Sequence, residues 1–296
     1  MSKTEPTIPF FHTLQGLIIL GRPVDGIIIG STAVLGMIVS LRSMPSFTQL
    51  SFGLLCGILV LAGMDTLNDY LDIEIDKISK SWRPLPQGTV SRQLALLAAI
   101  IETMLALTLG YFLFNYQAIL VGLIAITAAV VYSKWLKPIF LAKNIIVAFS
   151  LSLAFLGGAL SVNSAPQIDL TFLLLQLLTF VAAFIFEVHK DLGDLRGDSL
   201  HEVQTLPTRF GPIKTVKLII LGYTMAWMIA VSFIFIMEVD LIYVLILLLT
   251  LVLLILVLYL LDKDPLNNIE STRRIMTLVM GFILLGLARL TLLNLN

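Results

Sequence analysis

The chain has 296 residues, of which 58% are hydrophobic and 13% are charged, whereas soluble domains carry about 25% charged residues. This composition excludes a water-soluble globular fold. Nineteen Lys and Arg residues balance nineteen Asp and Glu residues, so the net charge is zero and no nucleic-acid-binding surface is expected.

Nine long apolar segments follow one another along the chain. A helix of about 20 apolar residues crosses the hydrocarbon core of a membrane, and continuously apolar segments favour helices over an alternating β-barrel. The predicted spans are 14–40, 48–70, 92–113, 115–133, 140–162, 170–190, 213–236, 239–261 and 272–293. We therefore expect an all-α polytopic membrane protein, with a single domain over 1–296 and nine transmembrane helices.

Basic residues are unevenly divided between the two sides of these spans. Of the nineteen, only Arg42 and Arg289 fall on the side opposite the N-terminus. Lys and Arg concentrate in cytoplasmic loops of membrane proteins. The pattern predicts that the N-terminus and the loops after the second, fourth, sixth and eighth spans are cytoplasmic, and that the C-terminus lies outside.

Acidic residues gather at the ends of the second and sixth spans. The first set is Asp65, Asp69, Asp72 and Asp76, and the second set is Glu187, Asp191, Asp194 and Asp198. Both sets step by four, three and four residues, which keeps the carboxylates on one face of a continuing helix. The repeat predicts two motif-bearing halves around a central cavity, each presenting acids at the same membrane surface.

Two such acidic sets need a counter-charge, because like charges on one helix face repel each other. Mg²⁺ prefers oxygen ligands and is typically held by one or two carboxylates together with substrate phosphates. Two opposed acidic sets would bind two or three Mg²⁺ ions around a diphosphate. The alternative is a solvated acidic loop that nearby Lys and Arg side chains neutralise.

The sequence around both sets resembles the UbiA superfamily of intramembrane prenyltransferases. Residues 68–76, NDYLDIEID, are similar to the family motif NDxxDxxxD. Residues 191–198, DLGDLRGD, are similar to the second motif DxxDxxGD, and Thr205-Leu206-Pro207 matches the TLP that follows it. The resemblance covers the whole chain, since nine helices with motifs after the second and sixth are the architecture of the family.

This resemblance implies an enzyme that transfers a prenyl group from a prenyl diphosphate to a lipophilic acceptor within membrane lipid, using two or more Mg²⁺ ions. The implied metal ligands are Asn68, Asp72, Asp76, Asp191, Asp194 and Asp198. Asn68 would also contact the diphosphate, and Asp72 and Asp198 would be catalytic. Asp65 and Glu187 have no clear counterpart in the family, and we interpret them as supporting residues.

Several basic and polar residues are also implied in substrate binding. Arg22, followed by Pro23, resembles the RP element of the family, with a catalytic and diphosphate-binding role. The other implied contacts are Lys80, Arg83, Tyr132, Lys134, Lys137, Asn144 and Lys190, with Lys137 among the catalytic residues. The bases could instead be ordinary cytoplasmic flanks, Asn144 a helix cap, and Lys190 a partner of a nearby acid.

Two further acids need an explanation. Asp25 stands where the family usually has Asn or a small polar residue, and we expect it to pair with Arg22. Glu102 lies inside the third span, where a charge is costly. A hydrogen-bonded or protonated Glu102 and a catalytic one both fit this position.

The first motif continues as IDxIxxxxRPLPxG over residues 75–88. This continuation is most similar to an archaeal branch of the family that joins geranylgeranyl diphosphate to the hydroxyl of geranylgeranylglyceryl phosphate in ether-lipid biosynthesis. Prenylation of an aromatic ring in quinone biosynthesis is the alternative. A cation-coupled transporter is a more remote one, because transporter sites lie near the membrane midplane whereas these acids gather at helix ends.

Overall fold

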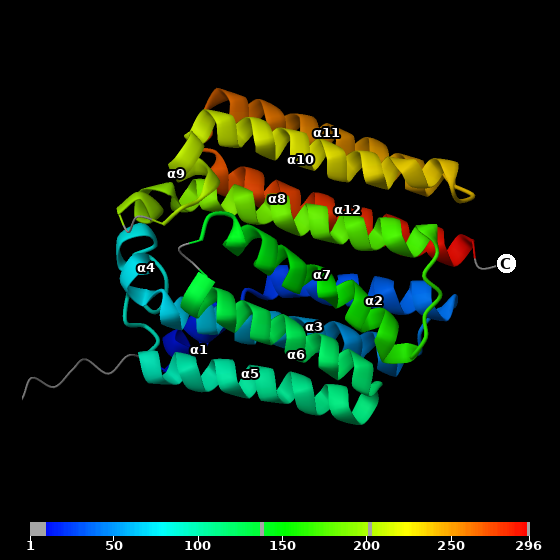
Figure 1. Cartoon of the computed structure of the whole chain (residues 1–296), viewed down its shortest axis with the longest axis horizontal. Helices are drawn as coiled ribbons and strands as arrows, with labels where there is room; N and C mark the ends of the chain where they lie inside the picture. Colours follow the sequence, from blue (N-terminus) through cyan, green and yellow to red (C-terminus); the bar gives the residue numbers. More distant parts are fainter. Residues whose placement is uncertain (1–9, 137–138, 201–202, 295–296) are drawn as a thin grey trace, which may run out of the picture.

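The computed structural model describes residues 10–136, 139–200 and 203–294, and these residues form a bundle of helices (Figure 1). The first half contains α1 (Phe10–Leu20), α2 (Pro23–Leu41), α3 (Phe47–Leu71), α4 (Ile73–Ser79), α5 (Arg92–Leu113), α6 (Tyr116–Val131), a π-helical turn η1 (Tyr132–Leu136) and α7 (Ala142–Val162). The second half contains α8 (Leu170–Leu200), α9 (Leu206–Phe210), α10 (Pro212–Ser232), a 3₁₀ turn η2 (Phe233–Phe235), α11 (Leu241–Lys263) and α12 (Ile269–Leu293).

Within the described residues, nine helices are long and apolar enough to cross a membrane, which confirms the predicted all-α polytopic fold. They are α2, α3, α5, α6 with η1, α7, α8, α10 with η2, α11 and α12. The helices run side by side along the long axis of the molecule (Figure 1).

The first predicted span, 14–40, is wrong in one respect, because it is broken into α1 and α2. Arg22 has a φ of 45° and therefore lies in the left-handed region, which interrupts the helix. Pro23 then starts α2, at the helix position where its missing N–H costs nothing. The break fixes Arg22 at the junction of the two helices.

The two acidic sets differ in the helices that carry them. α8 continues to Leu200, ten residues past the predicted end at 190, so its four acids share one helix. In contrast, α3 ends at Leu71 and the N–H of Asp72 donates to the carbonyl of Asn68. Asp76 therefore lies on the separate helix α4, and the prediction of one continuous helix face is wrong for the first set.

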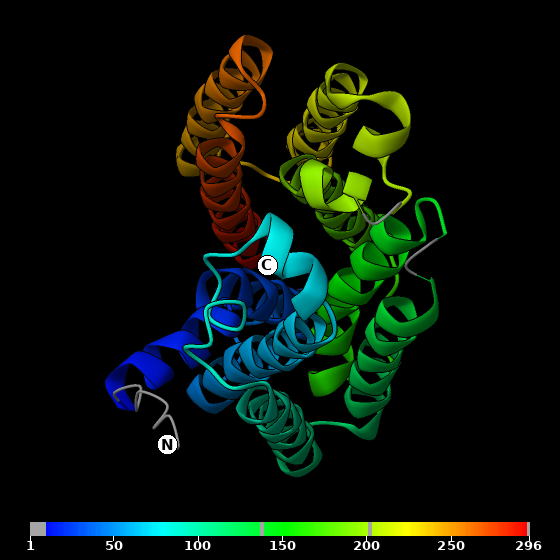
Figure 2. The ribbon, with the colours of Figure 1, turned by 90° about the vertical axis from the view of Figure 1, so that its left-hand side faces the viewer.

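The membrane-length helices form two groups, each with one acidic motif. Helices α2, α3, α5, α6 and α7 pack together in the first group, and α8, α10, α11 and α12 form the second. The groups meet where α7 packs on α8 and α12 packs on α2, an arrangement visible along the bundle in Figure 2. A shared apolar core that includes Leu35, Phe155, Phe172 and Leu287 joins them.

Glycines allow α2 and α7 to approach closely inside the first group. A Cβ atom added at Gly158 would overlap the carbonyl oxygen of Ala33, and one added at Gly36 would overlap that of Phe155. Small residues let membrane helices pack backbone against backbone. The relative position of α2 and α7 therefore depends on these two glycines.

We predict that Gly158→Ala lowers the free energy of unfolding by about 1–3 kcal/mol, because the new methyl group meets backbone that cannot move aside as a side chain would. Thermal unfolding of the purified protein in detergent measures this loss. Gly122→Ala on α6 is the matched control, because an added Cβ there meets nothing within 4 Å. Equal melting temperatures for the two variants would contradict the prediction.

Candidate functional site

A cavity runs between the two helix groups, and every membrane-length helix except α5 contributes to its lining. One end is charged and includes Lys80 and Asp198, whereas the other end is apolar and includes Leu175 and Leu287. Along α2 the lining extends from Arg22 to Leu35, a rise of about 20 Å at 1.5 Å per residue. The cavity is therefore shaped for an amphipathic ligand with a long apolar chain.

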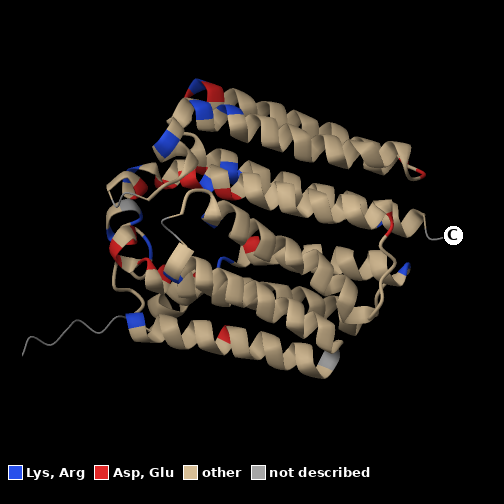
Figure 3. Cartoon of the chain, viewed as in Figure 1, with Lys and Arg blue, Asp and Glu red and all other residues tan. Residues whose placement is uncertain are grey.

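Charged side chains concentrate at the same end of the bundle (Figure 3). Among the described residues, seven acidic and five basic side chains line the cavity. They are Asp25, Asp65, Asp72, Asp76, Glu187, Asp194 and Asp198, with Arg22, Lys80, Arg83, Lys143 and Lys190. The lining thus carries an excess of negative charge.

Arg22 connects the helix break to the acids of α3. Its Nη1 lies 2.5 Å from Oδ1 of Asp65, and its Nη2 lies 2.7 Å from Oδ1 of Asp69. Burial alone would lower the pKa of this guanidinium, but the carboxylates of Asp65 and Asp69 outweigh that effect and raise the pKa above its ordinary value. Arg22 is therefore a permanent positive charge at the cavity wall.

Two more bases link the acidic motifs across the charged end. Nη1 of Arg83 lies 2.6 Å from Asp69 and 3.1 Å from Asp76. Nζ of Lys80 lies 2.7 Å from Oδ2 of Asp194, so a base of the first motif contacts an acid of the second. The predicted opposition of the two motifs is confirmed by this contact.

Burial shifts the pKa of two side chains in this network, Asp76 and Lys80. It raises the pKa of the Asp76 carboxyl, although Lys80 and Arg83 oppose the shift. It also lowers the pKa of Lys80, although Asp194 opposes that shift. Both shifts arise because burial penalises the charged form of the side chain.

The acids of α8 have different surroundings. Asp191 is fully buried, accepts from Lys143 through one oxygen and from Nδ2 of Asn144 at 2.7 Å through the other, and does not line the cavity. Asp194 and Asp198 do line it. Oδ2 of Asp198 is buried and has no hydrogen-bond partner among the described residues.

The cavity brings together most of the site residues that the sequence predicts. Those on its wall are Arg22, Asn68, Asp72, Asp76, Lys80, Arg83, Tyr132, Lys190, Asp194 and Asp198. Asp191 and Asn144 lie behind the wall, and Lys134 is exposed with its Nζ 5.0 Å from the ring centre of Trp135. Lys137 lies outside the described residues.

The sequence did not single out Lys143 or Ser133, which also line the cavity. Ser133 donates to Oδ1 of Asn68 at 3.2 Å. Lys143 pairs with Asp191, and its position beside Asn144 at the start of α7 was a signal that it faces the motif. Glu187 lines the cavity as well and accepts from Lys190 at 2.6 Å.

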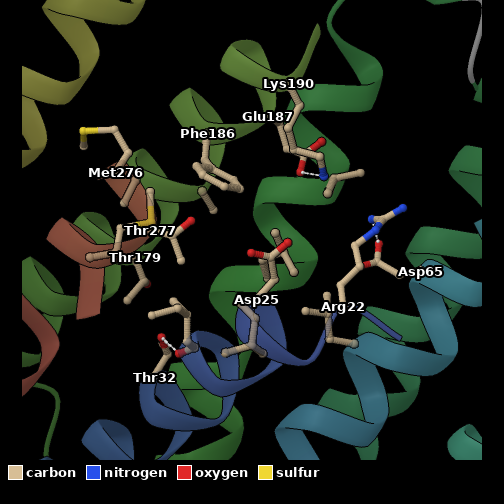
Figure 4. A pocket seen from close by; sticks show the side chains of 18 of the residues that line it. Arg22, Asp25, Thr32, Asp65, Thr179, Phe186, Glu187, Lys190, Met276 and Thr277 are labelled. Atoms are coloured by element: carbon tan, nitrogen blue, oxygen red, sulfur yellow. Dashed lines mark hydrogen bonds and ion pairs between the residues drawn. The ribbon is translucent and has the colours of Figure 1, made fainter. Parts of the chain in front are cut away.

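Asp25 and Glu102 are the two further acids that the sequence singled out. The expected pairing of Asp25 with Arg22 is wrong, since Arg22 pairs with Asp65 and Asp69, as Figure 4 shows for Asp65. Glu102 does not line the cavity, and its Oε2 atom is buried without a partner in the described part of the chain.

The donor chemistry at the charged end fits Mg²⁺. No three Asp, Glu, His or Cys side chains converge on one point within the described ranges, because the acids face Lys and Arg side chains. Asn68, Asp72, Asp76, Asp194 and Asp198 nevertheless supply only oxygen donors to the cavity. The unengaged Oδ2 of Asp198 and the excess negative charge both suit a hard divalent cation.

Comparison with known proteins adds an independent finding. The family model of the UbiA prenyltransferase family matches residues 29–291. Digeranylgeranylglyceryl phosphate synthase of Pyrococcus abyssi is 31% identical over 198 residues, which are 67% of this chain and 70% of that protein. The protein of the same name from Thermococcus kodakarensis is 32% identical over 197 residues, 67% of this chain and 69% of its own length.

Solved structures share the fold. A UbiA homologue from Archaeoglobus fulgidus bound to GPP and Mg²⁺ superposes with a TM-score of 0.66 at 20% identity, covering 92% of this chain and 99% of that one. A UbiA homologue from Aeropyrum pernix gives 0.74 at 18% identity, covering 90% and 97%. A structure of digeranylgeranylglyceryl phosphate synthase gives 0.64 at 23% identity, covering 95% and 99%.

We predict that Arg22→Ala lowers the free energy of unfolding by about 3 kcal/mol, because it leaves Asp65 without its ion-pair partner and leaves Asp69 with Arg83 alone. Thermal unfolding in detergent measures the loss. Adding Asp65→Asn to this variant should restore part of the stability, since it removes one unpaired charge. A double variant less stable than Arg22→Ala alone would show that the ion pair does not hold the junction.

Proposed function

Because this chain belongs to the UbiA prenyltransferase family, we propose that it transfers a geranylgeranyl group from its diphosphate to the hydroxyl group of geranylgeranylglyceryl phosphate, in ether-lipid biosynthesis. The relatives at about 30% identity that carry the name digeranylgeranylglyceryl phosphate synthase support this choice of acceptor. The observation that carries the proposal is the cavity itself, with the charged residues of both motifs at one end and an apolar lining at the other.

The metal would be held at the charged end. We assign this role to Asn68, Asp72, Asp76, Asp194 and Asp198, which line the cavity and carry oxygen donors. Asp191 would support them from behind the wall by holding Lys143 and Asn144. Bound Mg²⁺ would neutralise the developing charge of the leaving diphosphate. The excess of acids, together with an incoming diphosphate, favours more than one ion.

The basic residues would bind and orient the diphosphate. Arg22 and Arg83 carry planar guanidinium groups that suit bidentate contact with phosphate oxygens, and Lys80 adds a point charge between the two motifs. All three side chains line the cavity and form ion pairs with carboxylates of the two motifs or of Asp65. The prenyl diphosphate would thus bind to groups that are already in place.

The apolar lining would protect the reaction after the allylic carbon–oxygen bond breaks. The wall around the prenyl chain would be apolar there, because it is formed by Leu175, Leu178, Ile283 and Leu287. Exclusion of water prevents capture of the allyl cation by hydrolysis. The acceptor hydroxyl is then the oxygen nucleophile available to the cation.

We also propose that the N-terminus and the charged end of the cavity face the cytoplasm and that the C-terminus lies outside. The support is the concentration of basic residues at one end of the bundle (Figure 3). A cation-coupled transporter is less well supported, because the charged residues of the cavity gather at one end and the other end is lined by apolar residues such as Leu35 and Leu287.

The decisive experiment offers two acceptors to the purified protein with geranylgeranyl diphosphate and Mg²⁺. We expect the ether product from geranylgeranylglyceryl phosphate and none after chelation of the metal by EDTA, because the diphosphate would then leave without charge neutralisation. Mass spectrometry identifies the product. Prenylation of an aromatic acceptor such as 4-hydroxybenzoate in place of the alcohol would assign the protein to quinone biosynthesis instead.

We predict that Asp72→Ala and Asp198→Ala each reduce transfer by about 10³-fold, because loss of a metal ligand removes several kcal/mol of transition-state stabilisation. Initial rates at saturating donor measure the effect. Glu74→Ala is the matched control, because Glu74 lies in the same segment but is exposed and, among the described residues, forms an ion pair with Lys77 alone. Unchanged rates in both Asp variants would refute the assigned ligands.

A further inference from the structure

Asp25 occupies a distinct place in the cavity. It lies in the first turn of α2, three residues after Arg22, and its side chain lines the cavity wall. Figure 4 shows its carboxylate pointing into the cavity, between the Arg22–Asp65 ion pair on one side and Thr179 and Thr277 on the other. Asp25 therefore lies at the transition from the charged end to the apolar lining.

Most acids of the cavity are engaged, whereas Asp25 is not. Asp65 pairs with Arg22, Glu187 with Lys190, and Asp194 with Lys80. Asp25 makes no hydrogen bond or ion pair with any residue in the described part of the chain, although its charge acts electrostatically on Arg22. Its two oxygens are thus available to a ligand.

Three hydroxyl groups on the cavity wall, those of Thr32, Thr179 and Thr277, already donate to backbone carbonyls. Thr32 donates to the carbonyl of Ile28 at 2.9 Å, and Thr179 donates to that of Gln176 at 2.9 Å. Thr277 donates to the carbonyl of Arg273 at 3.2 Å. Because a hydroxyl has one proton, these three cannot also donate to Asp25 or to a ligand. The region is complementary to a ligand that brings its own hydroxyl proton.

We propose that Asp25 is the catalytic base that receives the proton of the acceptor hydroxyl. This role rests on the proposed function, because only an alcohol acceptor needs it in this form. The bond between C1 of the prenyl group and the diphosphate oxygen breaks, and its electron pair leaves with the diphosphate. An oxygen lone pair of the acceptor forms the new bond to C1, and the hydroxyl proton passes to a carboxylate oxygen of Asp25.

A carboxylate is a sufficient base for this step. Once the acceptor oxygen bonds to C1, it carries a positive charge, and a protonated ether is a far stronger acid than a carboxylic acid. The proton transfer is therefore favourable as soon as capture begins. C1 of the prenyl group must lie next to its diphosphate at the charged end. Asp25 lies beside that end, so its carboxylate would be close to the reacting carbon.

The competing explanation is that Asp25 only stabilises the N-terminus of α2. An acid in the first turn of a helix contributes about 0.3–1 kcal/mol through the helix dipole. That role requires neither a cavity-facing carboxylate nor the absence of a partner. It also predicts a change in melting temperature without a change in the chemistry of transfer.

The test separates ionisation of the donor from capture by the acceptor. Wild type, Asp25→Asn, Asp25→Glu and the exposed control Glu74→Gln are purified as full-length proteins. Geranylgeranyl diphosphate carrying ¹⁸O in the bridging position reports ionisation, because the label moves to a non-bridging position when the bond breaks and reforms. Ether formation with geranylgeranylglyceryl phosphate reports the complete transfer.

We expect Asp25→Asn to reduce ether formation by about 10²-fold or more, the usual contribution of a general base. Its isotope exchange should stay at the wild-type rate, which also shows that the variant is folded. Asp25→Glu should form more ether than Asp25→Asn, and Glu74→Gln should match the wild type.

Three results would overturn the assignment. Ether formation by Asp25→Asn at the wild-type rate would show that the carboxylate is not needed. A parallel loss of exchange and ether formation in both Asp25 variants would place the residue in ionisation or in folding. Failure of the wild type to form ether, with isotope exchange intact, would refute the alcohol acceptor of the proposed function and the base with it.

Discussion

Neutralisation of carboxylates held away from bulk water is the constraint on which this structure depends. The acids at the ends of α3 and α8 are buried or half-buried, and an unpaired charge in such a place is strongly destabilising. Arg22, Arg83, Lys80 and Lys143 supply the counter-charges. These ion pairs connect the break after α1, the segment after α4 and the start of α7 to the two motifs, so segments far apart in sequence are held around one cavity.

The same charges serve stability and chemistry. The bases that neutralise these carboxylates also line the cavity where a diphosphate would bind, so its binding would need little reorganisation of the side chains. The apolar core at the other end has the complementary effect. Its packed side chains, which include Leu35, Phe155 and Phe172, hold the two helix groups together. At the charged end, in contrast, a bound diphosphate could replace the carboxylates as the partner of the Lys and Arg side chains.

The fold and the motifs were predictable because both are periodic in the sequence. Apolar stretches identify the spans, and acids at regular steps identify the ends of α3 and α8. Side-chain direction was not predictable in the same way. Asp191 belongs to the second motif by spacing, yet its carboxylate faces Lys143 and Asn144 of α7 behind the wall. The left-handed backbone at Arg22 turns that residue toward Asp65 and Asp69, and leaves Asp25 free of the partner that sequence proximity suggested.

The apolar end of the cavity would limit the length of a bound chain. Under the proposed function, a prenyl chain held by its diphosphate near Arg22 would run along α2 toward the packed side chains of Leu35, Leu175 and Leu287. Arg22 directly precedes α2 and Leu35 lies within it, so the rise per residue of the helix fixes the distance between these two points. That distance would set the length of the prenyl chain that fits, and a larger or smaller side chain at position 35 would change it.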